Sequence, residues 1–231
     1  MIFNKFFILF KIGRKIGKSN IINIISETHK IPVFIKIFFN LLAFSFSSPR
    51  DMKGKDNLST SIQEMGTTFI KLGQFLATRP DIIGEKLSKE LESLQDKLPP
   101  FSKKEAEKII IENLGQSNFD DIIDLSEPIA AASIAQVHKA KIKEDNIIKN
   151  VAIKVLRPNI KKIFNDEIDA IMLLAYIIEN LITKTKRLKL IEVVFLFKEI
   201  TNHEMDLRFE AAAANEYAEN TKNDLGFFVP K

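Results

Sequence analysis

Lys154 is the residue whose type and setting most directly suggest chemistry, because it lies in the run Val-Ala-Ile-Lys-Val-Leu. Alternate side chains of a strand point to opposite faces, so Ala152 and Lys154 share one face of this run. The other face is apolar and consists of Val151, Ile153 and Val155. A small residue beside a lysine suits a flat base with its phosphates next to it. The alternative is a buried strand that carries one lysine at its edge.

An alanine-rich stretch, P-I-A-A-A-S-I-A-Q-V, begins at Pro128 and precedes that strand. In the nucleotide loops of kinases, G-x-G-x-x-G-x-V lies between two strands and a V-A-x-K strand follows. With Val137 at the valine of this pattern, the glycine positions are occupied by Ala130, Ala132 and Ala135. Alanine resists the positive φ that glycine allows. The spacing therefore predicts a phosphate-covering loop that differs from a kinase loop.

The tetrapeptide Lys71-Leu72-Gly73-Gln74 lies in a helix predicted over Ser59–Ala77. Apolar residues at helical spacing form one stripe of this helix: Ile62, Met65, Phe69, Leu72 and Leu76. Thr67, Lys71 and Gln74 lie on the opposite side, which in an ordinary surface helix is solvated. Gly73 is expected to let another backbone approach closely.

A third candidate stretch, Glu204-Met205-Asp206, lies in a long helical region predicted from Leu188 to Asn220. Glu210 follows one turn after Asp206, just before four alanines that favour helix. In kinases a glutamate on the helix after the V-A-I-K strand pairs with that lysine. Glu204 does not share the face of Asp206 in a straight helix, so a helix start or distortion is expected near it. The alternative is a solvated run of acids.

These three motifs, in this order, resemble those of the UbiB-type atypical kinase-like proteins, which include the mitochondrial ADCK proteins. The resemblance runs from roughly residue 58 to residue 231 and rests on an Ala-rich loop, a K-x-G-Q motif and an E-x-D motif. It implies an α+β fold, in which a helical N-terminal extension precedes the small lobe of a kinase-like fold. The chain has no catalytic loop and no metal-binding Asp of the kinase type. It is therefore expected to be the N-terminal portion of such a protein, with the C-terminal lobe absent.

The resemblance also assigns roles to single residues. Lys154 is expected to contact phosphates and Glu210 to orient it. A pocket-gating set is expected to cover the nucleotide: Lys71, Gly73, Gln74, Glu204 and Asp206. The other nucleotide-binding residues are expected in the Ala-rich loop and its strands: Ile129, Ala130, Ala131, Ala132, Ser133, Ile134, Ala135, Gln136, Val137 and Ala152. ATP or ADP with Mg²⁺ is the implied ligand, and no metal ligand and no complete catalytic set are expected in this chain.

An ATP-dependent kinase-like protein or ATPase that supports ubiquinone biosynthesis is the function that the resemblance implies. Prenyl-lipid intermediates and other proteins of that pathway are implied partners. The implied location is the cytoplasmic face of a bacterial inner membrane, with mitochondria as the alternative. One rival is a non-catalytic lipid-binding or scaffold protein of the same pathway. The glycine-free loop argues against a second rival, a true protein kinase.

Positive charge is concentrated at the N-terminus. Residues 1–55 hold ten Lys/Arg and two acids, whereas the remainder holds 24 Lys/Arg and 28 acids. Residues 1–18 carry five positive charges and no acid beside a Phe/Ile/Leu face, which predicts an amphipathic helix on an anionic membrane surface. The alternative is a helix packed on its own domain. No groove-reading or base-stacking motif points to nucleic acid as a partner. The absence of cysteine excludes disulfides and thiolate metal sites.

Three regions are predicted, covering residues 1–57, 58–115 and 116–231. The apolar run 31–46 is too short to span about 30 Å of hydrocarbon and is predicted to be a buried or interfacial helix. A linker is predicted over Ser45–Asn57 from its Ser, Pro, Gly and charged residues.

Further helices are predicted over Gly84–Leu98, from Ser102 to Leu114 and over Asn159–Thr183. Ser102 and Glu105 have the spacing of a capping box. The stretch Asp224-Leu225-Gly226-Phe227 resembles the metal-binding D-F-G motif of kinases. It is not assigned to that motif, because it follows Glu210 too closely for a catalytic loop to lie between them. A tight turn into a strand at residues 227–229 is predicted there instead.

Overall fold

The computed structural model describes residues 2–18, 21, 37, 58–94 and 98–230, which form two compact units, Met1–Ile171 and Met172–Lys231. The predicted apolar helix at 31–46, apart from Ile37, and the linker at Ser45–Asn57 lie outside the described residues. The predicted boundaries after residues 57 and 115 remain predictions. Within the described residues, no helix has the length and apolar character needed to cross a membrane.

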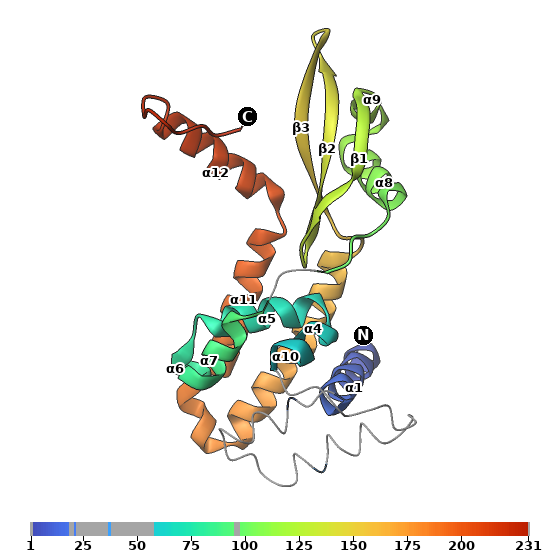
Figure 1. Cartoon of the computed structure of the whole chain (residues 1–231). Coiled ribbons are helices and arrows are strands. Elements are labelled where there is room, and N and C mark those ends of the chain that lie inside the picture. The colour runs from blue at the N-terminus through green and yellow to red at the C-terminus, as the bar shows by residue number, and fades with distance from the viewer. Residues whose placement is uncertain (1, 19–20, 22–36, 38–57, 95–97, 231) are drawn as a thin grey trace. The chain divides into compact units, whose positions relative to one another are not determined.

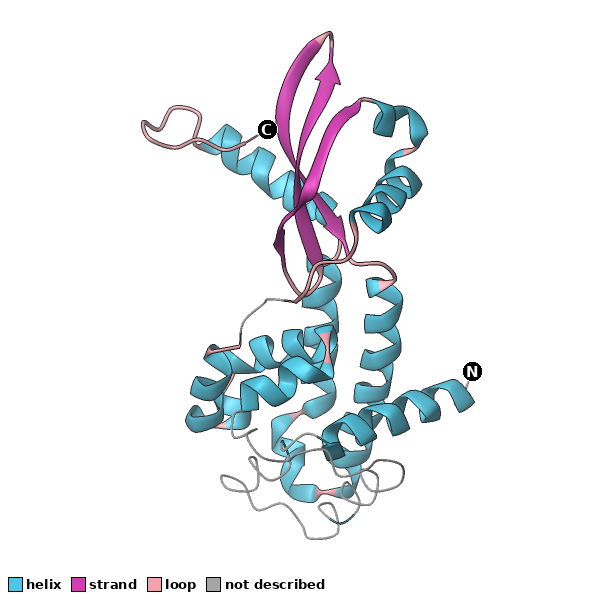
Figure 2. Ribbon diagram, turned by 45° about the vertical axis from the view of Figure 1, so that its right-hand side comes forward, coloured by secondary structure: helices cyan, strands magenta, loops and turns pink. Residues whose placement is uncertain are grey.

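A three-stranded antiparallel sheet dominates one end of the first unit (Figures 1 and 2). Its strands are β1 (Ile122–Ala131), β2 (Ala135–Glu144) and β3 (Ile147–Leu156), paired in that order. The turn between β2 and β3 consists of Asp145 and Asn146, with φ of 50° and 62°. Two central residues at positive φ match the twist of a tight hairpin. Helices together with this small sheet confirm the predicted α+β class.

Two helices, α8 (Lys103–Leu114) and α9 (Gln116–Asp120), lie beside the sheet and cover one of its faces. The predicted capping box is confirmed, because the Ser102 hydroxyl accepts from Glu105 N at 3.3 Å and Glu105 Oε2 accepts from Ser102 N at 3.3 Å. The buried side chains between α8 and the sheet are Ala106, Ile110, Leu125, Ala140 and Val155. This packing anchors the sheet and determines which of its faces is open.

The rest of the first unit is a group of helices: α1 (Ile2–Lys18), α4 (Leu58–Met65), α5 (Thr67–Ala77), α6 (Pro80–Ile83), α7 (Glu85–Glu92) and the start of α10 (Ile160–Leu181). Their common core includes Ile12, Leu58, Met65, Phe69, Leu87, Leu91 and Ala170. Ile12 of α1 is only 2% exposed. One face of α1 is therefore packed on its own unit, as the alternative for this helix predicts.

The helix predicted over Ser59–Ala77 is wrong as a single element, because the chain breaks at Gly66 into α4 and α5. Gly66 has φ 101° and ψ −176°, a backbone conformation that essentially only glycine adopts. The carbonyl of Met65 accepts a hydrogen bond from Lys15 Nζ at 2.7 Å. A cation at the C-terminal end of a helix is favourable, so α1 stabilises the break.

The second unit consists of the rest of α10, the 3₁₀ turn η1 (Thr183–Leu188), α11 (Leu190–Glu204) and α12 (Leu207–Asn220). Glu179 of α10 accepts a hydrogen bond from Ile191 N at 3.1 Å, which satisfies one of the unpaired amides at the start of α11. The long helical region predicted from Leu188 to Asn220 is therefore two helices. A turn follows α12, with Gly226 at φ 93°, but the strand predicted at 227–229 does not form.

Candidate nucleotide-binding site

Ala130, Val137 and Lys154 form a row across the three strands of the sheet. Ala130 pairs with Val137, and Val137 pairs with Lys154. Directly opposite residues of antiparallel strands have their side chains on the same face. Ala152 pairs with Lys139 in the next row of that face. The sequence prediction that Ala152 and Lys154 share a face is confirmed, and both are exposed, whereas Val155 on the other face is buried.

The Ala-rich loop is a tight turn in the structure. β1 ends at Ala131 and β2 begins at Ala135, so Ala132, Ser133 and Ile134 make the connection. Ala132 N donates to Ala135 O at 2.8 Å and closes the turn. Of the described non-glycine residues, only Asp145, Asn146, Asn159 and Lys189 have positive φ. The turn therefore needs no glycine, because Ala132, Ser133 and Ile134 all have negative φ, which alanine and serine adopt without strain.

All three carbonyls of this turn accept hydrogen bonds. Ala132 O accepts from the Arg157 guanidinium, at 3.0 Å from Nε and 2.8 Å from Nη2. Ser133 O accepts from Thr67 Oγ1 at 3.2 Å, and Ile134 O accepts from Arg157 N at 2.9 Å. Sequence reasoning missed Arg157 entirely. No periodicity marks it; the one available signal is a charged residue directly after the apolar end of a predicted strand.

Gln136 has its side chain on the opposite face from Lys154. It is 1% exposed, and its amide accepts from Phe101 N at 2.9 Å and donates to Phe101 O at 3.1 Å. Its nitrogen also lies 2.9 Å from His138 Nε2. The side chain is thus used to attach the chain before α8 to β2. The predicted contact of Gln136 with nucleotide remains a prediction, and it could involve only the backbone.

Lys71 and Gln74 are half-buried on α5, the helix that begins with Thr67. Gly73 is buried on the same helix. A Cβ atom at Gly73 would lie 2.8 Å from Leu94 Cδ2 and 3.4 Å from Ile62 Cγ2. The close neighbour of Gly73 is therefore the Leu94 side chain and not another backbone, so the prediction of a close backbone is wrong.

The E-x-D motif spans a corner between two helices of the second unit. Glu204 is the last residue of α11, and Asp206 caps α12 by accepting a hydrogen bond from Arg208 N at 3.2 Å. The Arg208 guanidinium also donates to Asp206, and this hydrogen bond raises the pKa of Arg208. The ring of His203 stacks on Phe209 with centroids 4.8 Å apart. The helix start or distortion predicted near Glu204 is confirmed, because α11 ends at Glu204 and α12 begins at Leu207.

The predicted site residues are divided between the two units. Lys71, Gln74 and Lys154 belong to the first unit, whereas Glu204, Asp206 and Glu210 belong to the second. Glu210 is exposed in the first turn of α12. The expected pairing of Glu210 with Lys154, and of the E-x-D motif with the K-x-G-Q motif, stay predictions.

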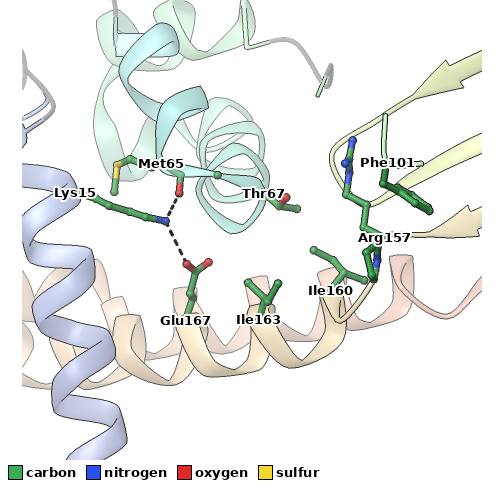
Figure 3. Close-up of a pocket in the computed structure, with 10 residues that line it drawn as sticks. Lys15, Met65, Thr67, Phe101, Arg157, Ile160, Ile163 and Glu167 are labelled. Carbon is green, nitrogen blue, oxygen red and sulfur yellow. Dashed lines mark hydrogen bonds and ion pairs between the residues drawn. The ribbon is translucent and has the colours of Figure 1, made fainter. Parts of the chain in front are cut away.

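A pocket of about 290 Å³ lies in the first unit between α1, the break at Gly66, the start of α10 and the end of β3. Figure 3 shows Lys15 and Glu167 at one end of it and Arg157 with Phe101 at the other. Lys15 Nζ lies 3.6 Å from Glu167 Oε1. Thr67 and Arg157 thus donate hydrogen bonds to the Ala-rich turn and also line this pocket. Lys154 does not line the pocket.

Comparison with known proteins gives a consistent result. Residues 93–231 match the family model of the ABC1 atypical kinase-like domain. The chain is 34% identical over 203 residues to the probable protein kinase UbiB of Marinobacter nauticus, covering 87% of this chain and 36% of that protein. It is 31% identical over 227 residues to the probable protein kinase UbiB of Pseudomonas paraeruginosa, covering 96% and 42%. The chain thus spans roughly two fifths or less of these relatives.

Proposed function

The chain belongs to the ABC1 atypical kinase-like family, and on that premise we propose that it binds an adenine nucleotide at the sheet face that carries Lys154. The observation that supports this most is the row of Ala130, Val137 and Lys154 across the sheet. Two small apolar side chains lie beside the exposed side chain of Lys154. The small side chains leave room for a flat base, and the ammonium group of Lys154 can bind phosphates. The Ala-rich turn lies at the end of strands β1 and β2.

ATP or ADP with Mg²⁺ is the proposed ligand, by the family's resemblance to kinases. The described residues gather no group of three or more His, Asp or Glu side chains that could hold a metal ion. No Mg²⁺ ligand is therefore assigned to them. Mg²⁺ would supply neutralisation of the phosphate charges, and the part proposed for this chain is to hold the base and to place Lys154 at the phosphates.

The biological role proposed for the protein is support of ubiquinone biosynthesis, as an ATP-dependent kinase-like protein or ATPase. Its relatives are named probable protein kinases, and the glycine-free turn favours a chemistry other than transfer to a protein. Prenyl-lipid intermediates and other proteins of the pathway are the proposed partners. A peripheral location at the cytoplasmic face of a bacterial inner membrane is proposed with them.

The N-terminal helix supplies the observation that favours membrane association. Phe7 and Phe10 of α1 are 67% and 45% exposed, and Lys11 beside them is exposed as well. These three side chains are exposed, whereas Ile12 of the same helix is buried. An exposed aromatic strip with basic neighbours suits an anionic lipid surface. A non-catalytic lipid-binding or scaffold protein is the second candidate function on the same observation.

Equilibrium binding of a fluorescent ADP analogue in the presence of Mg²⁺ tests the nucleotide proposal. Lys154→Ala should weaken binding about tenfold or more, because a hydrogen bond to a charged group contributes about 1.5–3 kcal/mol. Lys139→Ala is the matched control, since Lys139 is an exposed lysine on the same face, in the row of Ala152. Equal loss in both variants would contradict the proposal. Liposome binding that persists in a chain without nucleotide affinity would favour the scaffold instead.

A further inference from the structure

We propose that Thr67 and Arg157 position the Ala-rich turn for the nucleotide and connect it to the helix that carries Lys71 and Gln74. The Thr67 hydroxyl and the Arg157 guanidinium are together called the carbonyl clamp. The inference rests on the proposed nucleotide function, and it adds two residues that none of the three sequence motifs contains.

The clamp matters because a carbonyl of fixed direction also fixes the direction of the N–H group in the same peptide unit. A trans peptide is planar, so the N–H of the following residue points the opposite way from the carbonyl. Arg157 fixes Ala132 O, and Thr67 fixes Ser133 O. The N–H of Ser133 is therefore directed away from the Arg157 guanidinium, and the N–H of Ile134 is directed away from the Thr67 hydroxyl. Successive amides with a fixed direction form the kind of concavity that binds phosphate oxygens.

Arg157 contributes more than one hydrogen bond. Its guanidinium also donates to Pro99 O at 3.0 Å and lies 5.9 Å from the centroid of the Phe101 ring. Arginine has five donors in a planar group, whereas lysine has a single ammonium. The side chain thereby ties the turn to the segment that precedes α8. A lysine at this position would keep the charge but could not make this set of bonds.

Thr67 connects the turn to α5. It is the first residue of α5, directly after Gly66, so the break in the helix is what puts a hydroxyl at the turn. Lys71 lies one helical turn further along the same helix. The next residue, Thr68, is 0% exposed and its hydroxyl has no hydrogen-bond partner. Two adjacent threonines thus differ in the one property that the clamp requires.

Hydrogen–deuterium exchange and nucleotide binding, measured on the whole chain, test the clamp. The variants are Thr67→Val and Arg157→Lys, with Thr68→Val as the matched control and Thr67→Ser as the variant that retains the hydroxyl. Exchange of the Ala132 and Arg157 amides should rise about three- to tenfold in the first two, a factor that corresponds to the free energy of about one hydrogen bond. Affinity for the fluorescent ADP analogue should fall by a similar factor. Thr67→Ser and Thr68→Val should behave as wild type in both measurements.

The outcomes separate this inference from the proposed function. Faster exchange without weaker nucleotide binding would overturn the positioning role, and equal exchange in Thr67→Val and Thr68→Val would overturn the clamp itself. If the wild-type chain binds no nucleotide, the proposed function fails and the positioning role fails with it. The exchange data would then still decide whether the clamp holds the turn.

Discussion

Asp206 caps α12 with the same carboxylate that the family resemblance assigns to the set expected to cover the nucleotide. Its side chain is 20% exposed and pairs with the Arg208 guanidinium. The capping oxygen Oδ1 accepts from both Arg208 N and Arg208 Nε, so the cap and the charge pair share one carboxylate. A substitution that removes both cannot distinguish them. At the scale of single residues, the structure thus shows which replacement is informative.

Asp206→Ala should lower the free energy of unfolding by about 0.5–2 kcal/mol, because it removes an N-cap. Asp206→Asn should cost much less, since asparagine caps a helix about as well as aspartate. Urea denaturation followed by circular dichroism measures both. Any loss of nucleotide affinity in Asp206→Asn would then reflect the charge alone. Equal destabilisation by the two substitutions would contradict the capping role.

The arrangement of some residues, at the site and outside it, was predictable from local pattern alone. Ala152 and Lys154 share a face because strand alternation is strict, and Ser102 with Glu105 forms a cap because that spacing works within one turn. Arg157 and the side chain of Gln136 were beyond such reasoning. Their partners, Ala132, Pro99 and Phe101, are 25 to 58 residues away in sequence. Only the fold determines which carbonyl a guanidinium meets.

At the scale of elements, the break at Gly66 is the feature that sequence periodicity hid. The apolar stripe continues through it, from Ile62 to Phe69, and a single glycine within a helix costs only about 1 kcal/mol. Two tertiary hydrogen bonds stabilise the break. Lys15 Nζ donates to the Met65 carbonyl, and the Thr67 hydroxyl donates to Ser133 O. Neither contact leaves a mark on the stripe.

Gly66→Ala should therefore destabilise the chain by about 1–3 kcal/mol, the cost of a side chain at such a φ and ψ. Crowding adds nothing, because the nearest atom to a Cβ at this position is Lys15 Nζ at 3.9 Å. Thr60→Ala, an exposed change in α4, should stay within about 0.5 kcal/mol of wild type. Thermal unfolding of the two variants side by side makes the comparison. A harmless Gly66→Ala would show that α4 and α5 can join.

Acid should loosen the tip of the β2–β3 hairpin. Lys149 donates a hydrogen bond to Glu144, which holds the pKa of Glu144 below its ordinary value. A carboxyl whose pKa is lower in the folded than in the unfolded chain stabilises the fold above the unfolded pKa. That contribution is lost as the pH falls through the folded pKa. An NMR titration should find the pKa of Glu144 raised in Lys149→Met; an unchanged value would show that the ion pair does not persist in solution.

At the scale of the whole molecule, α1 has one face that is packed on its own unit and another that leaves apolar side chains exposed. The sequence offered membrane binding and packing on the protein as alternatives, and could not choose because both need the same kind of residue. The structure assigns the packing face to Ile12, with Ile8, Leu9 and Ile16 beside it. It leaves Phe7 and Phe10 outside. Which apolar residue a domain covers depends on the partner surface, here the buried cluster that includes Met65 and Phe69.

Ile12→Ala should lower the free energy of unfolding by about 2–5 kcal/mol, the usual cost of truncating a buried isoleucine. Phe10→Ala should leave stability nearly unchanged but reduce co-sedimentation with anionic liposomes. Vesicles of neutral lipid and high salt are the controls, since the attraction is electrostatic in part. Lipid binding that is equal for neutral and anionic vesicles, or that survives Phe10→Ala with Phe7→Ala, would contradict the membrane role of this face.

The amide of Gln136 has a consequence for the proton on its neighbour. Because Phe101 contributes both an N–H and a C=O to that amide, the amide cannot rotate by half a turn without losing both bonds. Its NH₂ group therefore faces His138 Nε2, which must accept, while Nδ1 lies 2.8 Å from Ser126 O and must donate. The tautomer of the buried His138 ring thus depends on the hydrogen bonds between Gln136 and Phe101, which attach the segment before α8 to β2. The nitrogen chemical shifts of His138 would therefore report whether that segment is attached.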